Sequence, residues 1–241
     1  MHIAMWTCAR SRSTLLLRAF QQHRRCLALD EPLYAPYLVS AGFDHPHRQE
    51  ILDHHETDYD RVIQEMTGLL PPNIDFSFQK HTANNLRKTD KLTWLGTFKS
   101  FFLIRSPKEI ILSRHDIYDG DRNFTLHEIG LRDLYQLFLK VQEITHTIPV
   151  VLDSTDLIKS PRTMLPRLCS RLGIEFSDSM MTWSPGLKES DPIWAKSWYR
   201  TLLNSSGFIP YKPATRPLPA HLVSLHEECL PFYEALSEHC I

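Results

Sequence analysis

Short apolar runs alternate along this chain with longer stretches in which apolar residues recur at helical spacing. The first apolar run covers residues 2–7, and a polar loop separates it from an apolar helical pattern at 15–20. Further strand-like runs lie at 25–29, 76–80, 99–104 and 149–152, and helical patterns lie at 58–70, 108–118, 126–147, 161–172 and 220–239. Alternating strands and helices predict an α/β fold with a parallel sheet covered by helices on both faces.

The loop between the first strand and the first helix predicts an anion site. It contains Arg10, Ser11, Arg12, Ser13 and Thr14. A helix N-terminus offers unpaired backbone N–H groups and the positive end of the helix dipole, which together bind phosphate or sulfate. The hydroxyl and guanidinium groups add further donors. The plainer alternative is a capped helix N-terminus with arginines at the surface.

This loop differs from two familiar phosphate-binding loops. It lacks both glycines and the lysine of a Walker A sequence. A phosphatase loop built on Cys8 would need an arginine six residues later, where this chain has Thr14. We therefore expect a phosphorylated nucleotide to bind here through a loop of another type.

Other predicted strand ends also carry polar side chains. Glu31 follows the second strand, Lys80 and His81 end the third, Arg105 follows the fourth and Asp153 follows the fifth. In parallel sheets, ligands bind beyond the carboxyl ends of the strands. We therefore expect these side chains to share one site with the first loop.

Arg105 belongs to a second candidate phosphate motif. Pro107 begins the helix after the strand, at a position where its missing N–H costs nothing. Ser113 lies two helical turns further on, so Arg105 and Ser113 can reach one phosphate from two sides. The plainer alternative is a surface helix capped by Ser106.

Composition indicates an ordinary globular protein. The chain has 241 residues, of which 42% are hydrophobic and 23% charged, and we interpret residues 1–241 as a single domain. A net charge of -1 argues against a general nucleic-acid binder. Five cysteines without a C-x-x-C pair are typical of reduced thiols. No signal peptide or membrane span is expected, so we predict a cytoplasmic protein.

The very polar segment 44–60 contains His45, His47, His54 and His55. Their spacing matches no standard zinc pattern and no cysteine is near, so we expect a solvated loop or lid and no metal site. Residues 210–219 are rich in proline and predict a connector into the final helix.

The two phosphate motifs resemble those of the PAPS-dependent sulfotransferases, whose donor is 3′-phosphoadenosine 5′-phosphosulfate. The family's 5′-phosphosulfate loop is roughly P-[RK]-S-G-[ST]-T, and here Ala9 replaces the proline and Arg12 the glycine. The family's 3′-phosphate signature is R-[DN]-P-R-D-x-x-x-S, and Arg105 and Ser113 keep its spacing. Residues 150–174 are similar to a further strand and helix of the family. The divergent bacterial and cyanobacterial-type branch is the most similar.

The resemblance implies a P-loop-like parallel sheet, the sulfotransferase fold. It also implies metal-free, in-line transfer of a sulfuryl group from PAPS to a hydroxyl or amine of a small-molecule acceptor. The product would be the 3′,5′-bisphosphate PAP. From the net charge and the lack of a long apolar run, we expect no nucleic-acid or membrane partner. The donor-binding residues implied are Arg10, Ser11, Arg12, Ser13, Thr14, Arg105 and Ser113. Segments 186–188 and 194–196 are candidates to cover the 3′-phosphate or the adenine.

Four residues are candidates for catalysis. Arg10 would stabilise charge on the leaving phosphate, because it cannot lose its proton. Glu31 is the first candidate for the general base and His81 the second. Lys80 would assist at the bridging oxygen.

Two other functions remain open from the sequence. One is a phosphotransferase or kinase with a degenerate P-loop, in which Asp153 would mimic a Walker B carboxylate and Thr14 would contact Mg²⁺. The other is a catalytically silent nucleotide-binding module.

Overall fold

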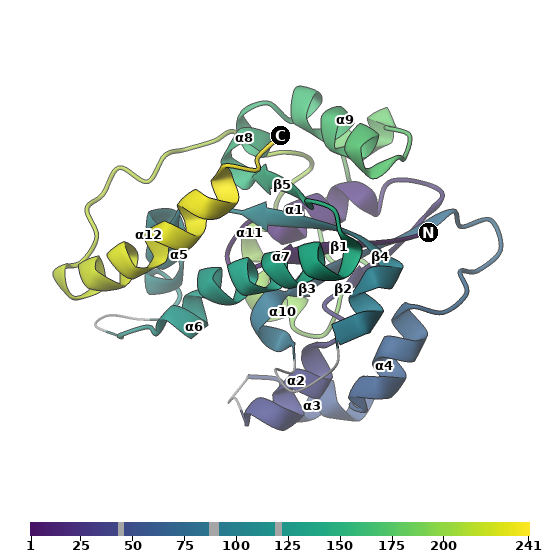
Figure 1. The fold of residues 1–241 in the computed structure, drawn as a ribbon, viewed down its shortest axis with the longest axis horizontal. Helices are drawn as coiled ribbons and strands as arrows, with labels where there is room; N and C mark the ends of the chain where they lie inside the picture. The colour runs from purple at the N-terminus through teal and green to yellow at the C-terminus, as the bar shows by residue number, and fades with distance from the viewer. Residues whose placement is uncertain (43–45, 87–91, 119–121) are drawn as a thin grey trace.

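A five-stranded parallel sheet forms the centre of the computed structural model, which describes residues 1–42, 46–86, 92–118 and 122–241 (Figure 1). The strand order is β2-β3-β1-β4-β5. The strands are β1 (His2–Thr7), β2 (Cys26–Asp30), β3 (Phe76–Thr82), β4 (Phe98–Ile104) and β5 (Val150–Asp153). The predicted α/β fold with a parallel sheet is therefore confirmed.

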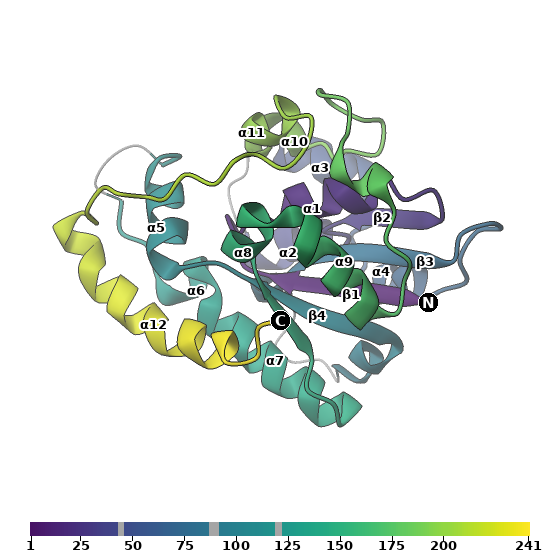
Figure 2. The same cartoon turned by 90° about the horizontal axis from the view of Figure 1, so that it is seen from above.

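Alternation of side chains along the strands produces two buried layers. Ile3 and Met5 point to one face of the sheet, and Ala4 and Trp6 to the other. The first face is covered by α1 (Ser13–Phe20), α2 (Tyr34–Ala41), α3 (Arg48–His54), α8 (Ser154–Lys159) and α9 (Pro161–Leu172). The second is covered by α4 (Tyr59–Met66), α5 (Pro107–His115), α6 (Leu126–Ile129), α7 (Leu131–Thr145) and α12 (Val223–Ser237). Figure 2 shows both layers from above.

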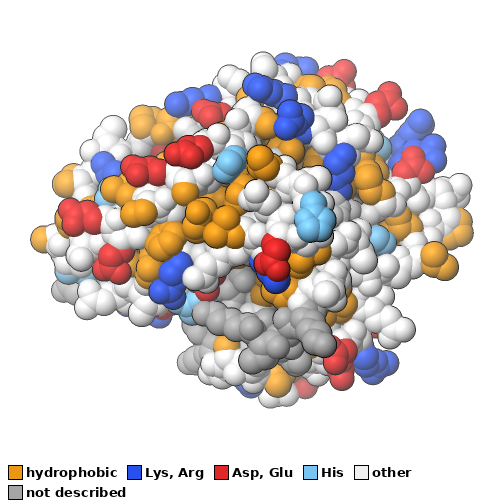
Figure 3. All heavy atoms as spheres, in the orientation of Figure 1, with side chains coloured by type: hydrophobic (Ala, Val, Ile, Leu, Met, Phe, Trp, Pro, Cys, Tyr) orange, Lys and Arg blue, Asp and Glu red, His pale blue; other side chains and the backbone are white. Residues whose placement is uncertain are grey.

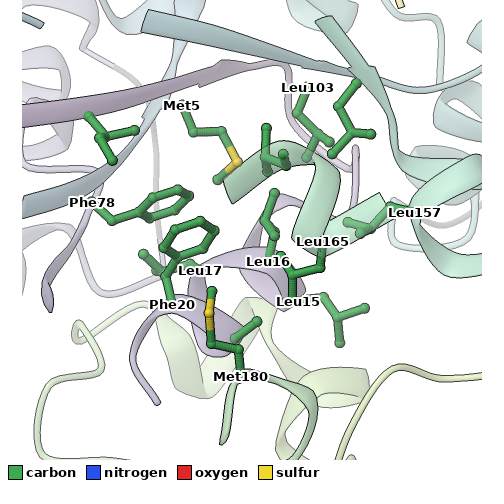
Figure 4. Close-up of a cluster of buried hydrophobic side chains, with 14 of the residues drawn as sticks. Met5, Leu15, Leu16, Leu17, Phe20, Phe78, Leu103, Leu157, Leu165 and Met180 are labelled. Carbon is green, nitrogen blue, oxygen red and sulfur yellow. The ribbon is translucent and has the colours of Figure 1, made fainter. Parts of the chain in front are cut away.

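Aromatic and aliphatic side chains fill the layer between the sheet and α1 (Figure 4). The ring of Phe20 stacks on that of Phe78, with centroids 3.7 Å apart. Leu16 is fully buried between α1 and the strands. Burying one such side chain contributes about 1.5–3 kcal/mol to stability. This packing fixes α1, and with it the loop that precedes the helix.

A glycine divides the helix predicted at 126–147. Gly130 has φ +83 and separates α6 from α7. A Cβ added to Gly130 would lie 3.2 Å from the Cβ of Cys8, in the loop after β1. The left-handed backbone and this close approach both require glycine, and hydrophobic periodicity alone does not reveal either.

The prediction of a loop over 44–60 was wrong for most of the segment. It contains α3 and the beginning of α4, and Ile51 is completely buried. His45 lies outside the described residues. Within the parts of the chain that are described, no three histidine, cysteine or acidic residues are grouped so as to hold a metal ion.

The proline-rich segment is a connector, as expected. Residues 210–219 contain no helix or strand, and the chain passes α5 on its way from α11 (Arg200–Leu203) to the 3-10 turn Ala220–Leu222 and α12 (Figure 2). Arg216 fixes it by donating to the carbonyl oxygen of Leu112 at 3.0 Å. Hydrophobic side chains gather over α7 and α12 on the face seen in Figure 3, with charged groups around them. No helix in the described ranges is both long and apolar enough to cross a bilayer.

Candidate functional site

Two adjoining cavities lie beyond the carboxyl ends of the strands. One, of about 360 Å³, contains Arg105 and Ser113 and is called the Arg105 cavity. The other, of about 220 Å³, contains Glu31 and Lys80 and is called the Glu31 cavity. Both are lined by Arg10, Ser13, Thr14, Trp198 and Tyr199, so these five residues form a shared wall.

The loop after β1 is held in an unusual backbone conformation. Arg10 and Arg12 have φ values of 66° and 67°, in the left-handed region that non-glycine residues rarely adopt. The backbone thus turns sharply and α1 begins at once at Ser13. Ser13 and Thr14 face both cavities. Ser11 does not line either one, because its buried hydroxyl bonds to that of Thr7.

The two predicted phosphate motifs come together. Arg105 donates through Nη1 to the carbonyl oxygen of Arg10 at 2.6 Å. Arg10 in turn donates through Nε to Oγ of Ser113 at 3.2 Å. Burial and the positive charge of Arg105 lower the pKa of Arg10, but a guanidinium stays protonated in proteins. The Arg105 cavity is therefore strongly cationic.

Glu109 organises the arginines of this cavity. Its Oε2 lies 2.8 Å from Nε of Arg105 and 2.9 Å from Nη2 of Arg12. Its Oε1 accepts a hydrogen bond of 2.7 Å from the hydroxyl of Tyr211. Burial alone would raise the pKa of Glu109, but hydrogen bonds from Tyr211 and Arg105 outweigh it and the pKa is lowered. Arg12 also lies over the Tyr211 ring, 5.4 Å from its centroid, so its side chain turns into the cavity.

Glu31 is fixed by three donors at the end of β2. Its Oε2 accepts hydrogen bonds from the hydroxyl of Thr82 at 2.9 Å and from the amide of Asn85 at 3.2 Å. Its Oε1 lies 2.8 Å from Nζ of Lys80. The side chain is 15% exposed and faces the Glu31 cavity. A carboxylate held in this way can receive a proton from a hydroxyl group in the cavity.

Lys80 is a buried cation between two carboxylates. Its Nζ lies 2.8 Å from Asp30, the register partner of Lys80 on β2, and 3.1 Å from the hydroxyl of Tyr199. Burial alone would lower the pKa of Lys80, but the charges of Asp30 and Glu31 raise it well above its ordinary value. Tyr199 completes the cluster by donating to Asp30 at 2.6 Å. Lys80 therefore holds Glu31 in place.

His81 does not reach either cavity. Successive side chains of a strand point to opposite faces, so His81 turns away from the face of Lys80. Its ring stacks on Trp6, with centroids 4.6 Å apart, and is 1% exposed. Neither ring nitrogen has a hydrogen-bond partner among the described residues. Burial, helped by the positive charge of Lys80, lowers the pKa of His81 to about 3.

Asp153 also lies outside both cavities. Its carboxylate caps α8 by accepting from the backbone N–H of Thr155 at 2.6 Å. It also accepts a hydrogen bond of 2.7 Å from the hydroxyl of Tyr233. A carboxylate used in this way serves the fold, and the structure does not bring it to Thr14.

Most of the aromatic walls of the site were not predicted from the sequence; Trp194 lies in the segment 194–196 expected to cover the nucleotide, but it lines the Glu31 cavity. Tyr34, Tyr37, Tyr118, Trp194 and Trp198 line the Glu31 cavity, and Arg114 faces it from α5. Tyr211 and Lys212 line the Arg105 cavity, whereas residues 186–188 line neither. Local spacing links Trp194 with Trp198, Tyr34 with Tyr37 and Arg114 with Tyr118, but these groups are far apart from one another in sequence.

Comparisons with known proteins found a family model, curated relatives and solved structures that resemble this chain. The family described as "Sulfotransferase domain" matches residues 1–240. The chain is 33% identical over 237 residues to Branched-chain-amino-acid aminotransferase-like protein 2 of Arabidopsis thaliana. That match covers 98% of this chain and 41% of the relative, so the chain spans about two fifths of the relative's length.

Two solved structures share the fold. One is the sulfotransferase domain from the curacin biosynthetic pathway, with a TM-score of 0.54, 16% identity and coverage of 98% of this chain and 96% of that one. The other is a sulfotransferase from Alicyclobacillus acidocaldarius, with a TM-score of 0.56, 11% identity and coverage of 98% and 94%.

Proposed function

We propose a function for this chain from the family to which it belongs, the sulfotransferase domains. The chain transfers a sulfuryl group from PAPS to a hydroxyl group of a small molecule. The observation that carries this proposal is the pair of cavities that meet at Arg10, Ser13 and Thr14. One cavity suits the nucleotide donor and the other the acceptor, so the shared wall is the place of transfer.

The residues of the Arg105 cavity fit the donor. PAPS carries two separate anionic groups, and this cavity has cationic groups at two places. Arg105 and Ser113 would hold the 3′-phosphate, and the N-terminus of α1 with Ser13 and Thr14 would hold the 5′-phosphate. The Tyr211 ring and Ile209 offer apolar surface for the adenine. Ser11 is buried, lines neither cavity and bonds to Thr7, so we assign it no contact with the donor.

Glu31 acts as the general base. The acceptor oxygen attacks sulfur in line with the phosphate oxygen that leaves, and the acceptor's proton passes to a carboxylate oxygen of Glu31. One S–O bond forms, the S–O bond to the 5′-phosphate breaks, and the products are a sulfate ester and PAP. Arg10 stabilises the negative charge that collects on the leaving phosphate. Lys80 positions Glu31.

An aminotransferase reaction, suggested by the name of the Arabidopsis relative, fits this site poorly. Covalent chemistry at a lysine needs a neutral amine, which enzymes obtain by lowering the pKa of the lysine. Lys80 is instead held between Asp30 and Glu31, which raise its pKa. The match covers less than half of that relative, so its name is not transferred to this chain.

Calorimetry with PAP tests the proposal. PAP should bind equally well with and without EDTA, and more tightly than 5′-AMP or ATP with Mg²⁺. Arg105→Ala should weaken PAP binding by about 2–3 kcal/mol, the scale of a charge-assisted contact. Arg162→Ala is the matched control, because Arg162 pairs with Asp178 at the surface and lines neither cavity. A requirement for Mg²⁺ would favour the phosphotransferase alternative.

A further inference from the structure

We propose that the acceptor is a small hydroxylated aromatic compound that carries a carboxylate, and that Arg114 binds this carboxylate while the hydroxyl reaches Glu31. This inference rests on the proposed sulfuryl transfer and names its substrate class. Three properties of the Glu31 cavity support it: its walls, its charges and the positions of its two polar ends.

The walls of the Glu31 cavity suit a single planar ring. A volume of about 220 Å³ is small for a ligand site. Tyr34, Tyr37, Tyr118, Trp194 and Trp198 supply much of its surface. The rings of Tyr34 and Trp194 meet edge to face, with centroids 4.8 Å apart. Aromatic rings bind well between such faces and edges.

Among the described residues, Arg10 and Arg114 are the cations of the cavity without an ion pair to a carboxylate, and Arg10 belongs to the wall shared with the Arg105 cavity. Lys80 is balanced by Asp30 and Glu31. Glu128 pairs with Arg122 at 2.8 Å. Arg114 has no ion pair with any described carboxylate, and its Nε is buried without a hydrogen-bond partner.

The described residues give Arg114 aromatic contacts and the Coulombic attraction of Glu128, but no direct ion pair. Its guanidinium lies 5.3 Å from the ring centroid of Phe124 and 5.7 Å from that of Tyr118. Burial lowers the pKa of Arg114, which reflects the cost of keeping its charge away from water. An anion that enters the cavity would offset this cost, and a carboxylate matches the planar fork of a guanidinium. A neutral phenol would leave the charge unpaired.

Arg114 serves the acceptor rather than the donor. It lines the Glu31 cavity, while the Arg105 cavity is lined by Arg10, Arg12 and Arg105. Glu31 follows β2 at one edge of the sheet, whereas Arg114 lies on α5 after β4, on the other side of β1. An acceptor held at both ends would therefore span the cavity, with its hydroxyl at Glu31 and its carboxylate at Arg114.

The test is a binding measurement on protein saturated with PAP, which needs no turnover. The probes are 4-hydroxybenzoate, 3-hydroxybenzoate and 4-hydroxyphenylacetate, each beside its neutral amide. At least one acid should bind roughly tenfold tighter than its amide, the scale of one charge-assisted pair. Arg114→Gln should reduce this ratio to about one. Arg162→Gln, which changes a remote surface cation, should keep the ratio.

The outcomes separate this inference from the proposed function. Absence of PAP binding would overturn sulfuryl transfer, and the acceptor assignment with it. Normal PAP binding with equal affinity for acids and amides would overturn the acceptor class alone. If the acid still binds tighter than its amide in Arg114→Gln, the acceptor class is also overturned. A loss of PAP affinity in Arg114→Gln equal to the loss of acid affinity would overturn it too, because Arg114 would then bind the donor.

Discussion

Arg12 adopts a backbone conformation that suits glycine. The sulfotransferase 5′-phosphosulfate motif, which this loop resembles, has a glycine at the same position. The φ of 67° at Arg12 costs a residue with a Cβ about 1 kcal/mol or more. Arg12→Gly and Arg12→Ala both remove the ion pair with Glu109, but only glycine relieves the backbone. We expect the free energy of unfolding of Arg12→Gly to exceed that of Arg12→Ala by about 1 kcal/mol, so Arg12→Gly should unfold at a higher urea concentration. Equal stability would show that the loop relaxes without strain.

Glu31 is the residue on which the proposed chemistry depends. Glu31→Gln keeps the size of the side chain and removes the proton acceptor. PAP affinity should stay normal in this variant, while turnover should fall by roughly 10²–10⁴, the usual contribution of a general base. Thr82→Val should reduce turnover less than Glu31→Gln does, because it removes only one of the hydrogen bonds that hold Glu31. Full activity in Glu31→Gln would exclude Glu31 as the base.

His81 should influence stability rather than catalysis. Its pKa is about 3 in the folded protein against 6.5 when exposed, so below pH 6.5 the unfolded chain binds the extra proton. Stability is therefore lost as pH falls from 6.5 towards 3, by about 2 kcal/mol at pH 5. His81→Phe should lose correspondingly less stability between pH 7 and pH 5 in urea unfolding. Equal losses of unfolding free energy in the unsubstituted protein and in His81→Phe would contradict a buried, neutral His81.

The junction of β5 and α8 depends on Asp153, which caps the helix and accepts a hydrogen bond from Tyr233. Asp153→Ala should lower the free energy of unfolding by about 1–2 kcal/mol, the usual cost of a lost N-cap. Asp153→Asn should lose less, because asparagine is a good cap. PAP affinity should be unchanged in both. A loss of nucleotide binding that depends on Mg²⁺ would instead support a Walker B role.

The secondary-structure elements were predicted unevenly, for physical reasons. The five strands are buried apolar runs, and their observed bounds differ from the predicted ones by only a few residues. α3 was missed because its polar residues hide the single buried anchor Ile51. The division at Gly130 depends on contact with Cys8, which is distant in sequence. Such tertiary contacts leave no local pattern.

At the scale of the whole molecule, the sheet explains which site residues could be predicted. Parallel strands gather their carboxyl ends, so the proximity of Arg10, Arg105 and Ser113 follows from the topology. The strand-end position of His81 also suggested a place at the site. However, neighbouring residues of a strand face opposite ways, so His81 points away from the face of Lys80. Arg114, Trp198 and Tyr211 were not predicted, because they belong to segments far apart in sequence that only the fold brings to the two cavities.

The wall common to the two cavities also governs the kinetics. If donor and acceptor lie on its two sides at the same moment, initial rates measured at several PAPS concentrations should give intersecting double-reciprocal lines. Parallel lines would instead indicate a covalent enzyme intermediate and ping-pong turnover. On the proposed assignment of the two adjoining cavities, a compound joining an adenosine bisphosphate to a phenolic ring needs only a short linker. Such a bisubstrate inhibitor should bind far more tightly than either half, because the second half binds at the high effective concentration set by the first.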